Sequence, residues 1–217
     1  MANASGKNCW IFGGGEFDPA CPHIPETGDL LIAADSGLDL ALRLGLTPDL
    51  TVGDFDSLGR VPTGDNVVKL PVEKDVTDAA AAVKLGRERG YSRFRFVGCT
   101  GGRPDHTFAA YQMLAELAGR GETGLLFGDG FTVTAIENGS LSFPALSAGT
   151  LSVFAVGGDA SGVTIAGAFY PLSGATLTPT FPLGVSNSFI GQPVTVEVKN
   201  GTLLVFAEGY PIPTFGK

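Results

Sequence analysis

One segment organises the sequence: Thr51-Val52-Gly53-Asp54-Phe55-Asp56-Ser57, in which an apolar run meets a glycine and then two carboxylates. Residues i and i+2 of an extended backbone point to the same side, which predicts that Asp54 and Asp56 converge just beyond the end of a strand. Like charges this close repel unless a cation lies between them, and Mg²⁺ prefers oxygen ligands. The segment therefore predicts a magnesium site, although a polar turn capped by aspartate would also explain it.

Strands and helices alternate along the first part of the chain. Helical patterns lie between several apolar runs, which predict strands at residues 8–12, 30–34, 49–52, 66–70, 93–97 and 123–127. This alternation predicts a mostly parallel, Rossmann-like α/β sheet with helices on its faces. Ligands bind such sheets at the carboxyl ends of the strands, where Asp35, Asp54 and the glycine-rich segments fall.

The character of the sequence changes after about residue 130. Short apolar or alternating segments, separated by Gly, Pro, Ser and Asn, replace the helical patterns at residues 131–136, 151–156, 163–166, 194–198 and 202–206. Such spacing is typical of an all-β sandwich or barrel. We therefore predict two domains, an α/β domain over residues 1–129 and a β-sandwich domain over residues 130–217.

Composition narrows the class of protein. A formal net charge of −8 argues against nucleic-acid binding through a broad basic face. The three cysteines, Cys9, Cys21 and Cys99, have no spacing that indicates a disulfide framework or a zinc site. The polar N-terminus and the lack of a long apolar run predict neither a signal peptide nor a membrane span, so we expect a cytoplasmic protein.

Two predicted helix starts carry residues of the types that bind phosphate in other proteins. In Lys74-Asp75-Val76-Thr77-Asp78, capping explains the acids and the threonine. Lys74 is unfavourable near a helix N-terminus unless it meets a polyphosphate, which such a terminus also favours. In Gly101-Gly102-Arg103-Pro104-Asp105-His106, a tight turn into a helix explains most residues, but Arg103 has the planar fork that binds phosphate oxygens in pairs. His106 is ambiguous between a surface residue and a site residue.

Taken together, these motifs resemble those of the thiamine pyrophosphokinase (thiamin diphosphokinase) family. In the first domain the matching segments are Ala34-Asp35-Ser36-Gly37, Pro48-Asp49, Gly53-Asp54-Phe55-Asp56-Ser57, Lys74-Asp75-Val76-Thr77-Asp78 and Gly101-Gly102-Arg103-Pro104-Asp105-His106. In the second domain the weaker matches are Leu151-Ser152-Val153, Gly162-Val163-Thr164, Gly167-Ala168-Phe169-Tyr170-Pro171-Leu172 and Val185-Ser186-Asn187. The resemblance thus spans nearly the whole chain.

The resemblance implies a Mg²⁺-dependent transfer of the diphosphate group of ATP to thiamine, giving thiamine diphosphate and AMP. It implies a nucleotide- and metal-binding catalytic domain, a thiamine-binding β domain, and a homodimer with active sites at the subunit interface. The metal ligands would be Asp54, Asp56 and Asp78, with Asp35 nearby. The implied ATP and phosphate residues are Asp35, Ser57, Asp75, Thr77, Arg103, Asp105 and His106, and the implied thiamine residues are Ser186 and Asn187.

The sequence departs from the family pattern at two places. Ser36 replaces one of the two glycines that usually follow the first acid. The only tryptophan, Trp10, lies in the first domain, so an aromatic contact to thiamine would have to come from one of four other residues, Phe169, Tyr170, Phe181 or Phe189.

The expected mechanism is in-line attack of the hydroxyethyl oxygen of thiamine on the β-phosphorus of ATP. Lys74 and Arg103 would offset the charge that develops, and one aspartate, Asp78 by preference, would accept the hydroxyl proton. An acidic chain also suits a cationic substrate. Two alternatives remain open: a metal-dependent nucleotide pyrophosphohydrolase that uses water as the acceptor, and a non-catalytic protein that binds thiamine or a nucleotide.

Overall fold

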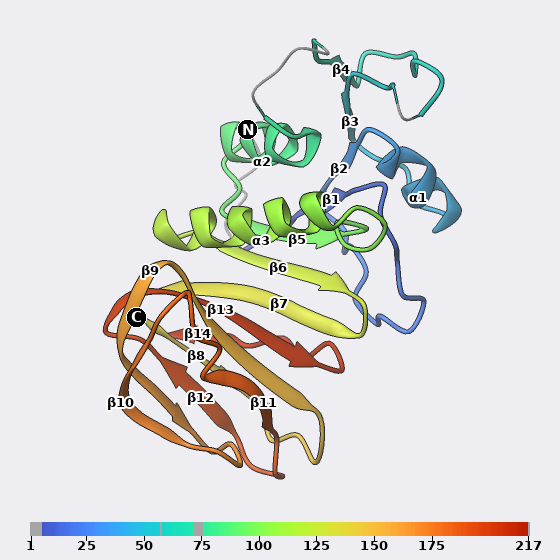
Figure 1. Cartoon of the computed structure of the whole chain (residues 1–217). Coiled ribbons are helices and arrows are strands. Elements are labelled where there is room, and N and C mark those ends of the chain that lie inside the picture. The colour runs from blue at the N-terminus through green and yellow to red at the C-terminus, as the bar shows by residue number, and fades with distance from the viewer. Residues whose placement is uncertain (1–5, 57, 72–75, 217) are drawn as a thin grey trace. The chain divides into compact units, whose positions relative to one another are not determined.

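The computed structural model describes residues 6–56, 58–71 and 76–216 of the chain. The described residues form helices α1 (Gly37–Arg43), α2 (Asp78–Glu88) and α3 (Pro104–Gly119), together with strands β1 to β14 (Figure 1). They group into two compact units, of which the first runs as far as Ala110 and includes Leu125–Asp129, and the second holds the remainder. The first unit is mixed α/β and the second is rich in β structure. Among the described residues, no helix is both long and apolar enough to cross a membrane.

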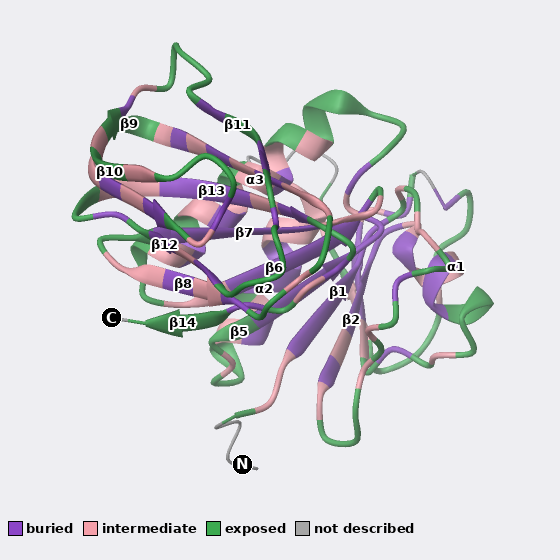
Figure 2. Ribbon diagram, turned by 90° about the horizontal axis from the view of Figure 1, so that it is seen from below, coloured by how far each residue is buried: buried purple, intermediate pink, exposed green. Residues whose placement is uncertain are grey.

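Short strands, most of them buried, form the centre of the first unit. The strands are β1 (Cys9–Phe12), β2 (Leu30–Ala34), β3 (Leu50–Gly53), β4 (Val67–Lys69), β5 (Arg93–Val97) and β6 (Thr123–Gly128), in the spatial order β6-β5-β1-β2-β3-β4. The pairings of β1 with β2 and β5, and of β3 with β2 and β4, are parallel. Each of these strands lies within one residue of its predicted bounds. Figure 2 shows β1 and β2 largely buried, which explains why they read as continuous apolar runs.

Helices α1 and α2 pack against the strands of the first unit. Helix α2 lies against β1, β2 and β3, and α1 lies against β1 and β2. Because β2 and β3 are parallel neighbours, with Ala34 opposite Val52, the residues that follow them emerge at the same edge of the sheet. This arrangement brings Asp35 and Asp54 to one edge, as the alternation of strands and helices predicts.

Antiparallel strands build the second unit. They are β7 (Phe131–Glu137), β8 (Ser140–Phe143), β9 (Thr150–Ala166), β10 (Leu172–Leu177), β11 (Gly184–Ser188), β12 (Val194–Glu197), β13 (Asn200–Glu208) and β14 (Thr214–Gly216). Their order is β14-β8-β12-β9-β13-β7, with β10 and β11 also paired to β9. The apolar residues of β8, β9, β12 and β13 alternate into a common buried core.

Strand β9 corrects one expectation. The sequence predicts two separate strands, at residues 151–156 and 163–166, but the structure has a single strand of 17 residues. Its first half pairs with β11 and with most of β13, and its second half pairs with β10, β12 and the first residue of β13. The two halves therefore have largely different partners, so the intervening glycines need not form a turn. Strands β8, β10, β11 and β14 are also absent from the predicted set, because they are short or too polar to show an apolar pattern.

Candidate active site

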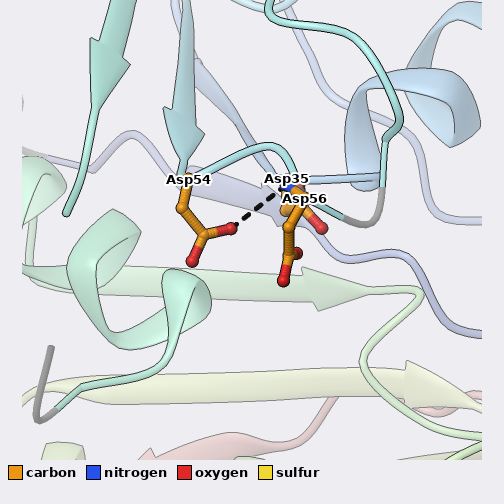
Figure 3. Close-up of side chains that lie close together, drawn as sticks. All are labelled: Asp35, Asp54 and Asp56. Carbon is orange, nitrogen blue, oxygen red and sulfur yellow. Dashed lines mark hydrogen bonds between the residues drawn. The ribbon is translucent and has the colours of Figure 1, made fainter. Parts of the chain in front are cut away.

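Three carboxylates gather at the carboxyl ends of β2 and β3. Asp35 follows β2, and Asp54 and Asp56 follow β3 (Figure 3). One carboxylate oxygen from each residue lies within 4.8 Å of the others. Asp35 is 8% exposed, Asp54 is partly buried and Asp56 is exposed, so the group opens toward solvent on one side. We call Asp35, Asp54 and Asp56 the acid group.

A turn at Phe55 brings Asp54 and Asp56 together. The extended backbone assumed from the sequence stops at Gly53, and Phe55 has a φ of 66°, in the left-handed region. The backbone N–H of Asp56 donates to Oδ1 of Asp54 at 3.3 Å. The Phe55 side chain is 3% exposed and anchors the turn. The predicted convergence is therefore present, but its cause is a tight turn with a buried aromatic residue and not the alternation of a strand.

Gly53 allows the two strand ends to approach each other. A Cβ atom at Gly53 would lie 3.1 Å from Cα of Asp35, closer than real Cβ contacts normally come. The Asp35 N–H donates to the carbonyl of Val52 at 2.8 Å, and Asp35 itself has a positive φ of 48°. A non-glycine residue in this conformation costs on the order of 1–3 kcal/mol unless its surroundings hold it there. The backbone on both sides of the acid group is thus tightly constrained.

The glycine-rich segment after β1 packs against the same edge of the sheet. The N–H groups of Gly13 and Gly15 donate to the carbonyls of Val97, the last residue of β5, and Gly98, which follows it. A Cβ atom at Gly13 would lie 2.5 Å from the carbonyl oxygen of Gly98, and one at Gly15 would lie 2.3 Å from that of Thr100. Close backbone packing therefore accounts for these glycines, whose sequence pattern is only a weak indication of phosphate binding.

The start of α2 lies partly outside the described residues. The predicted site residues Ser57, Lys74 and Asp75 fall in the segments that the structure does not describe. Thr77 is the N-cap of α2, and its side chain accepts from the N–H of Ala80 at 3.2 Å, as capping predicts. Asp78 lies in the first turn of α2, and the acids that gather among the described residues are Asp35, Asp54 and Asp56.

At the start of α3, Arg103 and Asp105 form a two-pronged ion pair. Nη2 of Arg103 donates to Oδ2 of Asp105 at 2.6 Å, and Nε donates to Oδ1 at 3.2 Å. These hydrogen bonds lower the pKa of Asp105 to about 2 and raise the pKa of Arg103. Both side chains are largely exposed, as is the neighbouring His106. Asp105 therefore holds one side of the Arg103 guanidinium, which has further N–H groups that can donate to another acceptor.

In the second unit, the adjacent residues Ser186 and Asn187 differ sharply in exposure. Ser186 is exposed, and its N–H donates to the Oγ of Ser152 at 3.1 Å. Asn187 is 5% exposed and its carboxamide binds the backbone of Tyr170 and Ser188. Of the candidate aromatic residues, Phe189 is 3% exposed and packs edge-on against Phe143 in the core, so Phe189 offers no free ring face.

Sequence reasoning expects Phe55 to be a packing residue, which its burial confirms, but it does not predict the turn there or the grouping of Asp35 with the other two acids. Asp35 is expected only near the metal ligands, yet it is one of the three clustered acids. The available signal was its position directly after a strand adjacent to β3. Nothing in the residue type predicts the positive φ of Phe55, because phenylalanine seldom adopts that conformation.

Profiles of known protein families match most of the chain, one for a catalytic domain and one for a ligand-binding domain. The profile of the thiamin pyrophosphokinase catalytic domain matches residues 21–123, and that of the thiamin pyrophosphokinase vitamin B1 binding domain matches residues 142–203. The chain therefore belongs to the thiamin pyrophosphokinase family. It is an enzyme with thiamine diphosphokinase activity, as predicted from its motifs. No curated protein sequence matches the chain significantly.

Solved structures share the fold across almost the whole chain. Thiamine pyrophosphokinase from Bacillus subtilis is 24% identical, with a TM-score of 0.81, over 93% of this chain and 99% of that chain. A thiamin pyrophosphokinase family protein from Enterococcus faecalis is 25% identical, with a TM-score of 0.77, over 93% and 98%. Thiamin pyrophosphokinase from Candida albicans is 12% identical, with a TM-score of 0.77, over 96% and 91%. The fold is thus retained at very low sequence identity.

Proposed function

We propose that the transfer of diphosphate from ATP to thiamine takes place at the acid group. The observation that carries this proposal is the convergence of Asp35, Asp54 and Asp56 at the carboxyl ends of β2 and β3, within the segment matched by the catalytic-domain profile. Parallel sheets bind their ligands at this edge. The products are thiamine diphosphate and AMP.

The donor set of the acid group fits Mg²⁺. Three carboxylates with oxygens within 4.8 Å of one another repel when ionised, a cation between them would relieve that repulsion, and all three donors are oxygen. Asp54 and Asp56 are the proposed ligands from the β3 turn, with Asp35 from β2 and Asp78 from α2 as further ligands. When bound there, Mg²⁺ would neutralise phosphate charge and orient the transferred group.

The phosphate groups of ATP are assigned to residues at the two helix starts. Lys74 and Arg103 would offset the charge that develops on the diphosphate, and α2 would add its N-terminal N–H groups. Arg103 is already oriented by Asp105, which reduces the freedom it loses on binding. The remaining proposed contacts are Ser57, Asp75, Thr77 and His106, and Asp78 is the proposed acceptor of the hydroxyl proton of thiamine.

The two domains would divide the substrates. We assign ATP and the metal to a Rossmann-like domain over residues 1–129 and thiamine to a β-sandwich over residues 130–217, with Ser186 and Asn187 on the thiamine side. The two sets of strands that flank β9 support the sandwich, because one bent strand can contribute to two layers. We further propose a cytoplasmic homodimer with its active sites at the subunit interface, which light scattering and mixed-variant complementation would test.

A product assay tests the proposed function directly. The chain is incubated with thiamine, ATP and Mg²⁺, and thiamine diphosphate and AMP are separated and quantified. We expect equal amounts of both products and no turnover of ATP without thiamine. Release of AMP and pyrophosphate without thiamine would indicate a nucleotide pyrophosphohydrolase. Binding of either substrate without any product would indicate a sensor.

A further inference from the structure

Asn187 is a buried polar residue on an otherwise exposed stretch of β11. Its side chain is turned inward by an irregularity in the strand, where the register between β11 and β9 shifts between Gly184 and Asn187. Ser186, directly before it, has a φ of 59°. Irregularities of this kind redirect a side chain to the other face of a strand. The local backbone therefore places an amide where an alternating strand would not.

The carboxamide of Asn187 replaces a strand partner for Tyr170. Its Oδ1 accepts from the N–H of Tyr170 at 2.9 Å and from the N–H of Ser188 at 2.9 Å. Its Nδ2 donates to the carbonyl of Tyr170 at 2.7 Å. The N–H of Tyr170 needs an acceptor oxygen and its carbonyl needs a donor N–H, so these contacts also define which way the Asn187 carboxamide is oriented. Both backbone groups of Tyr170 are thus held by one buried side chain.

What Asn187 holds in place is an exposed pair of aromatic rings. Phe169 is 59% exposed and Tyr170 is 63% exposed, and their ring centroids lie 4.7 Å apart at an interplanar angle of 79°. The N–H of Phe169 also donates to the carbonyl of Ser188 at 3.0 Å. Two large exposed rings on a backbone secured at consecutive residues form a preformed surface for an aromatic ligand. We call Phe169 and Tyr170 the aromatic pair.

We propose that Asn187 is a positioning residue that presents the aromatic pair to the flat, cationic ring system of thiamine. This inference rests on the proposed function, since it takes thiamine as the ligand. A cation over an aromatic face is attracted by the ring quadrupole, and rings that are ordered before binding lose little entropy when the ligand arrives. Asn187 acts on thiamine through Tyr170 and does not contact it, whereas Ser186 is free to present its side chain outward.

The proposal is tested with three variants of the full chain. Asn187→Ala removes the anchor, Phe169→Leu with Tyr170→Leu removes the rings, and the third variant combines all three changes. We expect the first two variants each to raise the KM for thiamine by about tenfold, with the KM for ATP unchanged. We expect the combined variant to be no worse than the ring variant, because an anchor has no effect when the rings are absent. Asn200→Ala, an exposed asparagine of the same unit, is the matched control.

Specific outcomes would overturn the proposal. If the effects of Asn187→Ala and the ring changes multiply, Asn187 contacts thiamine itself. If the ring variant keeps the KM of the unaltered chain, the aromatic pair does not bind thiamine. Should Asn187→Ala fail to fold, the ring variant still decides the question, because its side chains are exposed. Asn187→Asp, which retains the acceptor but loses the Nδ2 donor, should then give an intermediate KM, and an unchanged KM would contradict the anchor.

Failure of this inference is distinguishable from failure of the proposed function. An unaltered chain that makes thiamine diphosphate, alongside variants with unchanged KM for thiamine, refutes only the role of Asn187 and the aromatic pair. An unaltered chain that makes no thiamine diphosphate and shows no heat of thiamine binding in calorimetry refutes the proposed function, and with it the ligand assigned to the aromatic pair.

Discussion

Phe55 in the first unit and Ser186 in the second hold a similar backbone conformation, with φ values of 66° and 59°. At the first turn, the residue with positive φ is buried, and of the two flanking acids Asp54 is partly buried and Asp56 is exposed. At the second turn, the residue with positive φ is exposed and its neighbour Asn187 is buried. The apolar side chain goes inward in one case, and an amide with three backbone contacts goes inward in the other.

This difference shows that a residue with positive φ at a strand can support two kinds of binding site. A reversed φ breaks the alternation of a strand, and the side chains then determine which neighbour faces solvent. In the first unit the turn leaves charge at the surface, suited to a cation and phosphates. In the second unit it secures an exposed aromatic pair, suited to a flat organic ring. Four predictions test this contrast.

The largest effect is expected from removing charge at the first turn. Asp54→Asn should lower the rate of thiamine diphosphate formation at saturating Mg²⁺ by at least about 100-fold, since even outer-shell partners of a metal ligand contribute roughly 10–100-fold. Glu88→Gln makes the same charge change at an exposed position of α2 and should leave the rate unaltered. An Asp54→Asn variant with full turnover would show that the acid group does not hold the metal.

The next largest effect is expected at the start of α3. Arg103→Ala should strongly reduce turnover without lowering Tm, because the exposed pair with Asp105 adds little to stability while the guanidinium is assigned to phosphate. Arg120→Ala, which removes an exposed i,i+4 pair with Glu116 on the same helix's C-terminal side, should leave turnover intact. Equal turnover in the two variants would mean that Arg103 serves only its ion pair.

Stability measurements compare the two turns directly. Phe55→Ala should lower the free energy of unfolding in urea by about 3–5 kcal/mol, because a buried ring is lost. Phe55→Gly should be about 0.5–1 kcal/mol more stable than Phe55→Ala, because glycine tolerates the positive φ but costs entropy. Ser186→Gly and Ser186→Ala should show a similar difference with a much smaller total loss. A large total loss at Ser186 would refute the contrast in burial.

The smallest expected effect is a change in how Tm depends on pH. It distinguishes Asp29, a charged side chain held by hydrogen bonds in the first unit, from the neutral amide of Asn187 in the second unit. Burial alone would raise the pKa of Asp29, but the N–H groups of Asn8, Glu26 and Trp10 outweigh it and lower that pKa below its usual value. A lowered pKa means that Asp29 stabilises the folded state above about pH 4 and loses this contribution as the pH falls through the folded pKa.

Thermal unfolding at several pH values tests this role of Asp29. Asp29→Asn should reduce the fall of Tm below about pH 4, whereas the exposed Asp65→Asn should not. Asn187→Ala should lower Tm equally at each pH, because the Asn187 amide does not titrate. A pH-dependent effect of Asn187→Ala would contradict the neutral anchor.

The amount that could be read from the sequence differs between the units. In the first, most strands are buried, largely apolar runs whose bounds are visible in the residue order, and β2 and β3 end directly before Asp35 and Asp54. In the second, β9 pairs with different strands along its two halves, and polar strands such as β11 depend on that pairing for their existence. No local pattern contains this information.

The sequence by itself determined the alternation of strands and helices, the acids at the strand ends and the family, because these depend on residue order and type. The tertiary structure decided which carboxylates meet, through the parallel pairing of β2 with β3 and the turn at Phe55. It also decided that Asn187 binds Tyr170, since a reversed φ at Ser186 turns the amide inward. Backbone handedness at single residues is set by packing between distant segments, and residue order does not record it.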